Sequence, residues 1–426
     1  MTDPESSDTE IRPFRIDVPQ TDVNDLRDRL ARTRWPDDLL GGNWSRGVPL
    51  GYLHGLAEYW RTDYDWRTHE AALNEFPQFT TTIDGQTIHF LHVRSPQSSA
   101  LPLVITHGYP SSIAEFVRLI GPLTDPRAHG GDPTDAFHVV APSLPGFGFS
   151  SPLEGTGWES TRTAKAWVEL MRRLGYERYG AHGGDIGAGI SGDLGIHDPE
   201  RVIGAHVSTD PTALALIGGM LPDETDDLTE AQKGRLEELR GWEADGRGYL
   251  QIQSTRPQTL AYGLNDSPAA QLAWIVEKFK EWTNPAAELP EDAVDRDQLL
   301  TNVSIYWFTG TGASAARFIY EAAHADRDWG AMSPASTGMA VFAADNLLRY
   351  VLNSDGTSSI GRSSRAAAIS LPWRHPSCSS ATSGRSSAIF ADAAWCSAPA
   401  LGSRPTSRAS WPYRCPSRFT RPVISL

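Results

Sequence analysis

The spacing of apolar and polar residues changes along the chain, and each change predicts a different kind of element. Residues 13–77 are rich in tryptophan and have apolar positions at helical spacing over 23–33 and 51–62. We expect these aromatic side chains to pack the helical segment onto the rest of the protein. After this segment, short apolar or alternating runs predict β-strands at 79–83, 88–93, 101–106, 138–141, 178–182 and 202–207.

Helical patterns come between the later strands. Residues 161–174 and 188–196 have helical spacing, and a capping-box pattern from Ser112 to Glu115 opens a further helix. Strands that alternate with helices indicate an α/β protein with a mostly parallel sheet. Catalytic residues are then expected at the carboxyl ends of the strands.

Strand patterns are not found between about 210 and 301. Helical patterns at 228–242 and 269–282 predict an α-helical insertion that forms a cap over the sheet, and 304–308 and 338–342 are expected to be later core segments. We therefore divide the chain into a helical N-terminal part that leads into the first strands (1–95), a first part of the core (96–210), a cap (211–300), a second part of the core (301–356) and an aberrant tail expected to be disordered (357–426).

Composition excludes several classes of function. The chain has 426 residues, of which 40% are hydrophobic, and this is enough for a sizeable core. Its formal net charge of -14 argues against nucleic acid or an anionic membrane as a partner. No apolar stretch reaches the roughly 18 residues of a transmembrane helix, and residues 1–10 are acidic and polar, so we expect a soluble cytoplasmic protein. All three cysteines lie beyond residue 377, so no disulfide framework is expected in the body of the protein.

The most informative motif is Gly183-Gly184-Asp185-Ile186-Gly187, which lies between a strand-like run and a helix-like run. This is the setting of a nucleophile elbow, a sharp turn that holds one reactive side chain above an α/β sheet. The usual serine is replaced by Asp185, so the covalent intermediate would be an ester of the enzyme's own carboxylate. Such chemistry requires attack on an electrophilic sp3 carbon. Taken alone, the motif also fits a tight turn with a capping aspartate.

A second motif, His107-Gly108-Tyr109-Pro110, follows the strand predicted at 101–106. A loop at this place can direct the backbone N–H of Tyr109 to the same point as the N–H of Ile186, which would form an oxyanion hole. His107, Gly108 and Pro110 are candidates for substrate contact. The two motifs occur in the order and spacing that an α/β-hydrolase fold requires.

These motifs resemble the epoxide hydrolases of the α/β-hydrolase superfamily, and in particular the microsomal type. The resemblance covers about 13–350 and includes the loop 144–150, the cap segment 249–253 and the run 305–311. It implies a helical N-terminal domain without a membrane anchor, a helical cap, and hydrolysis of an epoxide to a vicinal diol. The implied partners are a small apolar epoxide and water, with no cofactor and no metal. The oligomeric state is left open, a homo-oligomer included.

The resemblance also implies roles for residues. Asp185 attacks the epoxide, and Tyr249 matches the first of two cap tyrosines that donate hydrogen bonds to the epoxide oxygen. The second is expected at Ile319, and we keep Tyr320, one residue later, as its candidate although one helical residue is a rotation of about 100°. Asp345 matches the acid that holds a catalytic histidine. The histidine itself is expected in a Gly-Gly-His-Phe segment, which this chain lacks.

A change of composition near the C-terminus explains this absence. From Gly361 onward the chain has nine arginines and no lysine or glutamate. When 368–376 is read back to codons and the frame is displaced, it can encode His-Phe-Ala-Ala-Met-Glu-Ala-Pro, with Gly-Gly before it. We infer a frameshift that begins near 355–358. His375 is the only histidine after Asp345 and is not expected to replace the missing base, so the ester should form slowly, or form and not turn over.

The coding DNA tests this hypothesis. Translation of the region around Asp355 in all three frames is expected to give the Gly-Gly-His-Phe segment in one of the other two. If no frame encodes that segment, the frameshift hypothesis is wrong.

Three other interpretations are considered. Haloalkane dehalogenases also place an aspartate at the elbow, but they usually carry a tryptophan after it where this chain has Ile186, and release of halide from a chloroalkane would identify them. A serine esterase is disfavoured, because no Gly-x-Ser-x-Gly occurs. The missing histidine supports a non-catalytic binding protein or the product of a pseudogene, which would bind ligand without forming diol.

Overall fold

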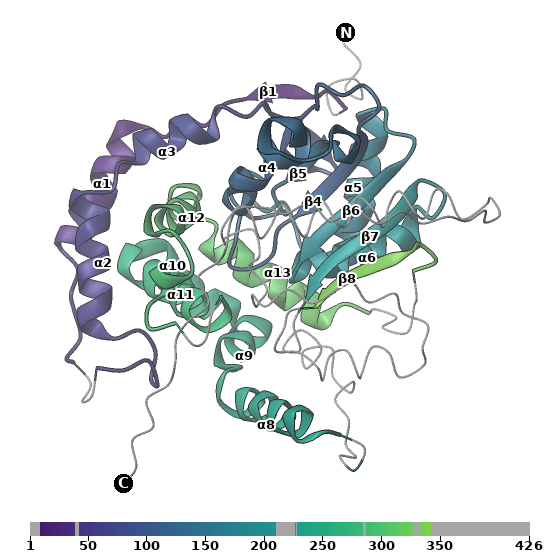
Figure 1. Cartoon of the computed structure of the whole chain (residues 1–426). Helices are drawn as coiled ribbons and strands as arrows, with labels where there is room; N and C mark the ends of the chain where they lie inside the picture. The colour runs from purple at the N-terminus through teal and green to yellow at the C-terminus, as the bar shows by residue number, and fades with distance from the viewer. Residues whose placement is uncertain are drawn as a thin grey trace.

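A single mixed sheet organises the computed structural model, which describes residues 9–38, 42–209, 226, 228–283, 287–326 and 333–341. Within these ranges the sheet has eight strands in the order β1-β2-β3-β5-β4-β6-β7-β8 (Figure 1). The strands are β1 (Arg12–Phe14), β2 (Gln78–Ile83), β3 (Gln86–Val93), β4 (Leu101–Thr106), β5 (Phe137–Pro142), β6 (Tyr179–Gly184), β7 (Val202–Thr209) and β8 (Thr337–Val341).

The sheet has an antiparallel end and a parallel end. β1 pairs with β2, β2 with β3 and β3 with β5, all antiparallel. From β5 through β4, β6 and β7 to β8 every pair is parallel. The predicted mostly parallel α/β sheet is therefore confirmed, and the carboxyl ends of its parallel strands meet at one edge.

Helices cover both faces of the sheet because successive strand residues face opposite sides. On β4, Val104 belongs to the apolar cluster that contains Trp167, whereas Leu103 and Ile105 belong to the cluster that contains Leu119. The helices that supply these clusters are α4 (Val117–Thr124) on one face, and α5 (Ser160–Arg173) and α6 (Ile186–His197) on the other.

The other helices are grouped at the N-terminus and after β7. The first group is α1 (Gln20–Ala31), α2 (Leu50–Thr62) and α3 (Trp66–Leu73). The second group is α8 (Glu230–Asp245), α9 (Gly248–Thr255), α10 (Pro257–Asp266), α11 (Pro268–Trp282), α12 (Arg296–Thr309) and α13 (Gly312–His324). Short 3-10 helices occur at η2 (Ile113–Phe116), η3 (Pro126–His129), η4 (Pro133–Asp135) and η5 (Pro290–Asp292).

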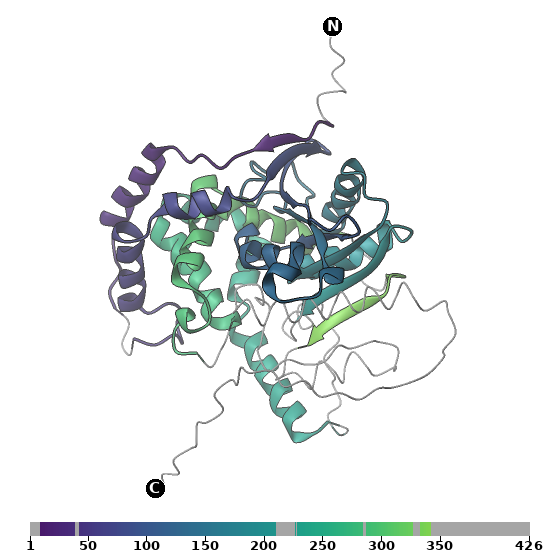
Figure 2. The ribbon, with the colours of Figure 1, turned by 45° about the horizontal axis from the view of Figure 1, so that its top comes forward.

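The N-terminal helices pack beside the second group, as both views show (Figures 1 and 2). Aromatic side chains make the connection, as expected from the sequence. The Trp60 indole is 1% exposed and donates to Ser304 Oγ at 3.0 Å, and the Tyr59 hydroxyl donates to Asp297 Oδ1 at 2.8 Å. Tyr64 is buried and its hydroxyl lies 3.0 Å from Thr301 Oγ1. The segment thus supports α12, which in turn contacts the site described below.

The sequence predictions of elements agree with the structure in most places. The segments 304–308 and 338–342 fall in α12 and, up to residue 341, in β8. Ser112 caps η2, since its Oγ accepts from the backbone N–H of Ala114 at 3.2 Å. The short strand β1 lies within the N-terminal segment that we expected to be helical. Among the described residues no helix is long and apolar enough to cross a bilayer.

Candidate active site

Asp185 occupies a sharp turn between a strand and a helix. β6 ends at Gly184 and α6 begins at Ile186, with Asp185 between them at φ 52° and ψ -124°. A non-glycine residue rarely adopts a positive φ, and such strain is concentrated at functional sites. The turn has the form of a nucleophile elbow, which raises one side chain above the carboxyl edge of the sheet.

Close backbone packing explains the two glycines that flank the elbow. A Cβ on Gly183 would lie 2.2 Å from the carbonyl oxygen of Gly187. A Cβ on Gly187 would lie 2.0 Å from the carbonyl oxygen of Thr106, at the end of β4. Real Cβ atoms do not approach backbone so closely, so only glycine allows α6 to begin against β4 and β6.

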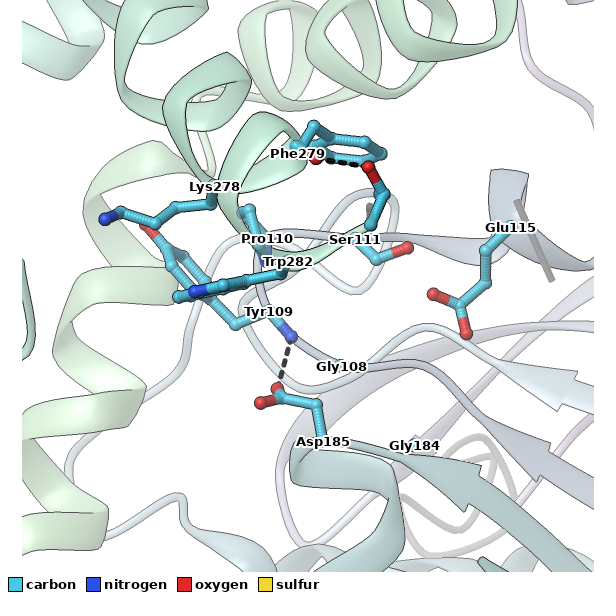
Figure 3. Close-up of a pocket in the computed structure, with 11 residues that line it drawn as sticks. Gly108, Tyr109, Pro110, Ser111, Glu115, Gly184, Asp185, Lys278, Phe279 and Trp282 are labelled. Carbon is cyan, nitrogen blue, oxygen red and sulfur yellow. Dashed lines mark hydrogen bonds between the residues drawn. The ribbon is translucent and has the colours of Figure 1, made fainter. Parts of the chain in front are cut away.

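The loop after β4 meets the elbow because β4 and β6 are neighbours in the sheet, with Thr106 opposite Gly183. The backbone N–H of Tyr109 donates to Asp185 Oδ1 at 2.7 Å (Figure 3). A Cβ on Gly108 would lie 2.4 Å from Asp185 Cβ and 2.6 Å from Asp185 Oδ1. The structure thus brings Asp185, Gly108 and Tyr109 together, as the sequence motifs predicted. Ile186 is the first residue of α6, directly after the nucleophile.

His107 supports the loop from behind. Its side chain is fully buried, its Nε2 accepts from the backbone N–H of Leu144 at 3.1 Å, and its Nδ1 lies 3.0 Å from the carbonyl oxygen of Gly108. Burial lowers the pKa of His107 to about 4. The ring is therefore neutral, and since Nε2 accepts, Nδ1 carries the proton and donates. Gly108 and Pro110 line the pocket beside Asp185, whereas His107 is not among the residues that line it.

One face of α12 holds the same loop in place. Asn302 Nδ2 donates to the carbonyl oxygen of Pro110 at 2.7 Å, and the Tyr306 hydroxyl donates to that of Ser111 at 2.8 Å. Gln298 Nε2 donates to the carbonyl oxygen of Ala114 at 3.3 Å. These three residues are four apart, so they lie along one face of the helix. Buried polar contacts of this kind fix the backbone donor that Asp185 faces.

The pocket lies between the elbow, this loop and α11. Its volume is about 30 Å³, and it is lined by Gly108, Tyr109, Pro110, Ser111, Glu115, Gly184, Asp185, Lys278, Phe279, Trp282 and Thr283 (Figure 3). Lys278 and Trp282 of α11 belong to this lining. Trp274, four residues before Lys278, donates from Nε1 to the Tyr109 hydroxyl at 2.5 Å. Burial raises the pKa of the Tyr109 phenol, so it stays neutral.

Tyr249 packs against this group from α9. Its ring is stacked on that of Tyr109, with centroids 6.5 Å apart, and meets the Trp282 ring edge-on at 5.1 Å. The ammonium of Lys278 lies 4.6 Å from the centre of the Tyr249 ring and is 2.7 Å from Glu277 Oε1 and 2.9 Å from Glu281 Oε2. This cation–π contact and the two ring contacts hold Tyr249 beside the loop that carries the Tyr109 N–H.

The chain is similar in sequence to proteins of one known family. Residues 11–116 match the family model "Epoxide hydrolase N terminus", and residues 102–242 match the "alpha/beta hydrolase fold" model. Epoxide hydrolase 1 of Oryctolagus cuniculus is 35% identical over 336 residues, which cover 74% of this chain and 73% of that protein. A protein of Stigmatella aurantiaca that bears an epoxide hydrolase name is 48% identical over 332 residues, 78% of this chain and 74% of its own length.

The chain belongs to the epoxide hydrolase family. Its fold is accordingly that of the α/β hydrolases. Among solved structures, the juvenile hormone epoxide hydrolase of the silkworm Bombyx mori has a TM-score of 0.79 and 28% identity, with 91% of this chain and 96% of that one covered. The Aspergillus niger epoxide hydrolase has a TM-score of 0.74 and 27% identity, with 92% and 98% covered.

Neither of the two candidate hydroxyl donors is among the described residues that line the pocket, although Tyr249 packs on the lining residues Tyr109 and Trp282. The Tyr320 ring is half-buried and stacks on His324 of its own helix, with centroids 4.1 Å apart, and it is not part of the pocket lining. Ile319 is 9% exposed and belongs to the apolar cluster that contains Tyr249. Ile319 and Tyr320 have different surroundings because neighbouring residues on a helix are rotated by about 100°. Asp345 and His375 lie outside the described residues.

Sequence reasoning missed the parts of this epoxide hydrolase that come from helices remote in sequence. α12 contributes the residues that hold the loop, and α11 contributes the residues that face Tyr109. A signal was present in both, because polar or aromatic residues recur every four positions, at 298, 302 and 306 and at 274, 278 and 282. Spacing alone did not show what these faces contact.

Proposed function

We propose that this chain opens an epoxide by attack of Asp185 and releases a vicinal diol after hydrolysis of the resulting ester. The observation that supports this most directly is the backbone N–H of Tyr109 at 2.7 Å from Asp185 Oδ1, in a pocket beside Tyr249. An aspartate on a strained elbow that faces a fixed backbone donor is suited to covalent catalysis. Family membership supports the same reaction.

In the first step we assign Asp185 Oδ2 as the attacking atom, since Oδ1 accepts from Tyr109. A bond forms between Oδ2 and one epoxide carbon, the bond from that carbon to the epoxide oxygen breaks, and the oxygen becomes an alkoxide. Tyr249 then gives its phenolic proton to this alkoxide. A phenol has an ordinary pKa of about 10, so it is protonated at neutral pH and still acidic enough to protonate an alkoxide.

In the second step water adds to the carboxyl carbon of the ester. Negative charge develops on Oδ1, which is the atom that already accepts from Tyr109. A donor aimed at the site of developing charge stabilises the transition state more than the ground state. Collapse of the intermediate releases the diol, and the proton left on the Asp185 carboxyl returns to the Tyr249 phenolate, which restores both groups.

The surroundings of the pocket support an apolar epoxide as substrate. Tyr109, Phe279 and Trp282 contribute aromatic side chains to the lining. Aromatic walls with a few polar groups are typical of sites for small apolar ligands. The cytoplasmic location and the homo-oligomer considered from the sequence stay predictions.

Replacement of Tyr249 tests the assigned acid. Tyr249→Phe keeps the ring that packs on Tyr109 and Trp282 but removes the hydroxyl, so the rate of ester formation is expected to fall about 100-fold. The rate is measured as the gain of one substrate mass on the protein after rapid mixing with a reactive epoxide. Tyr262→Phe is the matched control, because Tyr262 is 69% exposed on the neighbouring helix α10. Equal rates in Tyr249→Phe and the parent protein would show that Tyr249 is not the donor.

A further inference from the structure

A second carboxylate lines the pocket that holds Asp185. Glu115 lies on η2, directly after the loop that carries the Tyr109 N–H, and is only 6% exposed. It belongs to the same pocket lining as Gly184 and Asp185, and in Figure 3 it lies on the side of the pocket away from Lys278. The mechanism above gives this carboxylate no role, although burial of a charged group is costly.

Glu115 belongs both to the start of η2 and to the pocket lining. The sequence pattern predicted a capping box from Ser112 to Glu115, and in the structure Ser112 Oγ accepts from the backbone N–H of Ala114 at 3.2 Å. The Gln298 amide, which donates to the carbonyl oxygen of Ala114, fixes η2 against α12. This contact positions the backbone of η2, which carries Glu115, beside the pocket.

Asp185 and Glu115 also act on the same buried phenol. Burial raises the pKa of Tyr306 well above its usual value, and the nearby charges of Asp185 and Glu115 raise it further. Tyr306 donates to the carbonyl oxygen of Ser111, between the loop and η2. The geometric basis for a shared reaction is that both carboxylates line one pocket.

We propose that Glu115 is the general base that activates water for hydrolysis of the Asp185 ester. This proposal rests on the function proposed above and concerns its second step. The Glu115 carboxylate takes one proton from water while the water oxygen bonds to the carboxyl carbon of Asp185. The electron pair of the carbonyl bond moves to Oδ1, beside the Tyr109 N–H. When the pair returns, the bond between the carboxyl carbon and the ester oxygen of the substrate breaks, and the departing alkoxide takes the proton from Glu115, which completes the diol. The second water proton, left on the Asp185 carboxyl, returns to the Tyr249 phenolate.

The change in the charge of Asp185 on ester formation places the role of Glu115 in the second step. Before the first step Asp185 and Glu115 are two like charges that share a pocket, which is unfavourable. The ester of Asp185 is neutral, so afterwards Glu115 is the carboxylate that remains to attract a proton from water. A carboxylate within reach of a bound water is a competent general base.

The volume of the pocket and the nature of its other lining residues agree with the assignment of Glu115 as the base. The pocket volume of about 30 Å³ accommodates one or two water molecules, and the polar groups around it meet the need of a buried water for two to four partners. None of the residues that line the described pocket is a histidine. The Lys278 nitrogen is engaged with Glu277 Oε1 at 2.7 Å and with Glu281 Oε2 at 2.9 Å. Glu115 thus supplies a base that the sequence alone left missing.

Glu115→Gln separates the two steps. The variant keeps the size of the side chain and removes its basic oxygen, so ester formation is expected to continue at the parent rate while ester hydrolysis falls 100-fold or more, within the range of about 10²–10⁴ for loss of a general base. Both rates are read from time-resolved intact mass in a single turnover with a reactive epoxide, as the gain and then the loss of one substrate mass. The parent chain is expected to release diol, whereas Glu115→Gln accumulates the ester.

Two further variants distinguish a chemical role from a structural one. Ser112→Ala removes the cap of η2 and leaves the Glu115 carboxylate, so a merely loosened η2 would slow both steps in this variant. Glu115→Asp withdraws the carboxylate by one methylene, and slower hydrolysis with unchanged ester formation is expected there too, which keeps the test open if Glu115→Gln does not fold.

The outcomes are separable. Equal ester hydrolysis in the parent protein and Glu115→Gln would overturn the assignment of Glu115, as would a parent protein that forms the ester and never releases diol. If neither protein gains substrate mass, the function proposed for Asp185 is itself wrong.

Discussion

Asp185→Asn is expected to abolish ester formation, with a loss of roughly 10⁴-fold or more, as is found when a covalent nucleophile is removed. The amide oxygen can still accept from the Tyr109 N–H, and asparagine tolerates the positive φ of 52° at this turn. The loss is therefore chemical, because a neutral amide is a poor nucleophile. Intact mass after exposure to a reactive epoxide measures it: the parent protein gains the mass of one substrate and the variant does not.

The chain offers a closely matched control. Asp84 has the same residue type and the same φ of 52°, in the turn between β2 and β3, where it pairs with Arg162 and its side chain is 61% exposed. Asp84→Asn is expected to form the ester at the parent rate. If Asp185→Asn still gains substrate mass at a single site, the nucleophile is another residue and the proposed function needs a different centre.

The second large effect is expected from Gly108→Ala. The added Cβ would lie 2.4 Å from Asp185 Cβ and 2.6 Å from Asp185 Oδ1, so either the nucleophile or the loop must move. A displacement of about 1 Å at a reacting group costs on the order of 100-fold in rate. Ester formation is expected to fall by about that factor, measured by the same single-turnover mass experiment, with the melting temperature recorded alongside.

Gly192→Ala serves as the control for Gly108→Ala. Gly192 lies on α6, the helix that the elbow opens, and a Cβ there would meet nothing within 4 Å. Alanine in place of a helical glycine is expected to stabilise the fold by roughly 0.5–1 kcal/mol and to leave the rate unchanged. A full rate in Gly108→Ala would contradict the close approach of loop and nucleophile that the structure describes.

Much of the fold could be predicted from the sequence because its signals are local. The periods of apolar residues identified β4, α5, β6 and α6 to within two residues at each end. The glycine-rich elbow and the His107 to Pro110 loop predicted which backbone donor faces which side chain, and the Tyr109 contact with Asp185 agrees. The turn and the loop meet because parallel neighbouring strands end at one edge.

The predictions that depended on orientation were less complete. Tyr320 was kept as a candidate donor, yet its ring stacks on His324, because a shift of one position turns a helical side chain to a different face. His107 was expected to contact substrate, whereas both of its ring nitrogens are engaged with backbone groups of the two loops. No short-range pattern reports which side of a loop becomes the wall of a pocket.

By itself, the sequence determined the reactive group and its setting. An aspartate in a glycine-rich turn after a buried strand predicts covalent attack by a carboxylate, since residue identity and backbone curvature are local properties. Only the tertiary structure decided what surrounds that group. The α12 contacts that hold the loop, the α11 side chains against Tyr109 and the place of Glu115 in the pocket lining each join segments far apart in the chain. Such contacts follow from packing and burial of the whole chain, which no local pattern specifies.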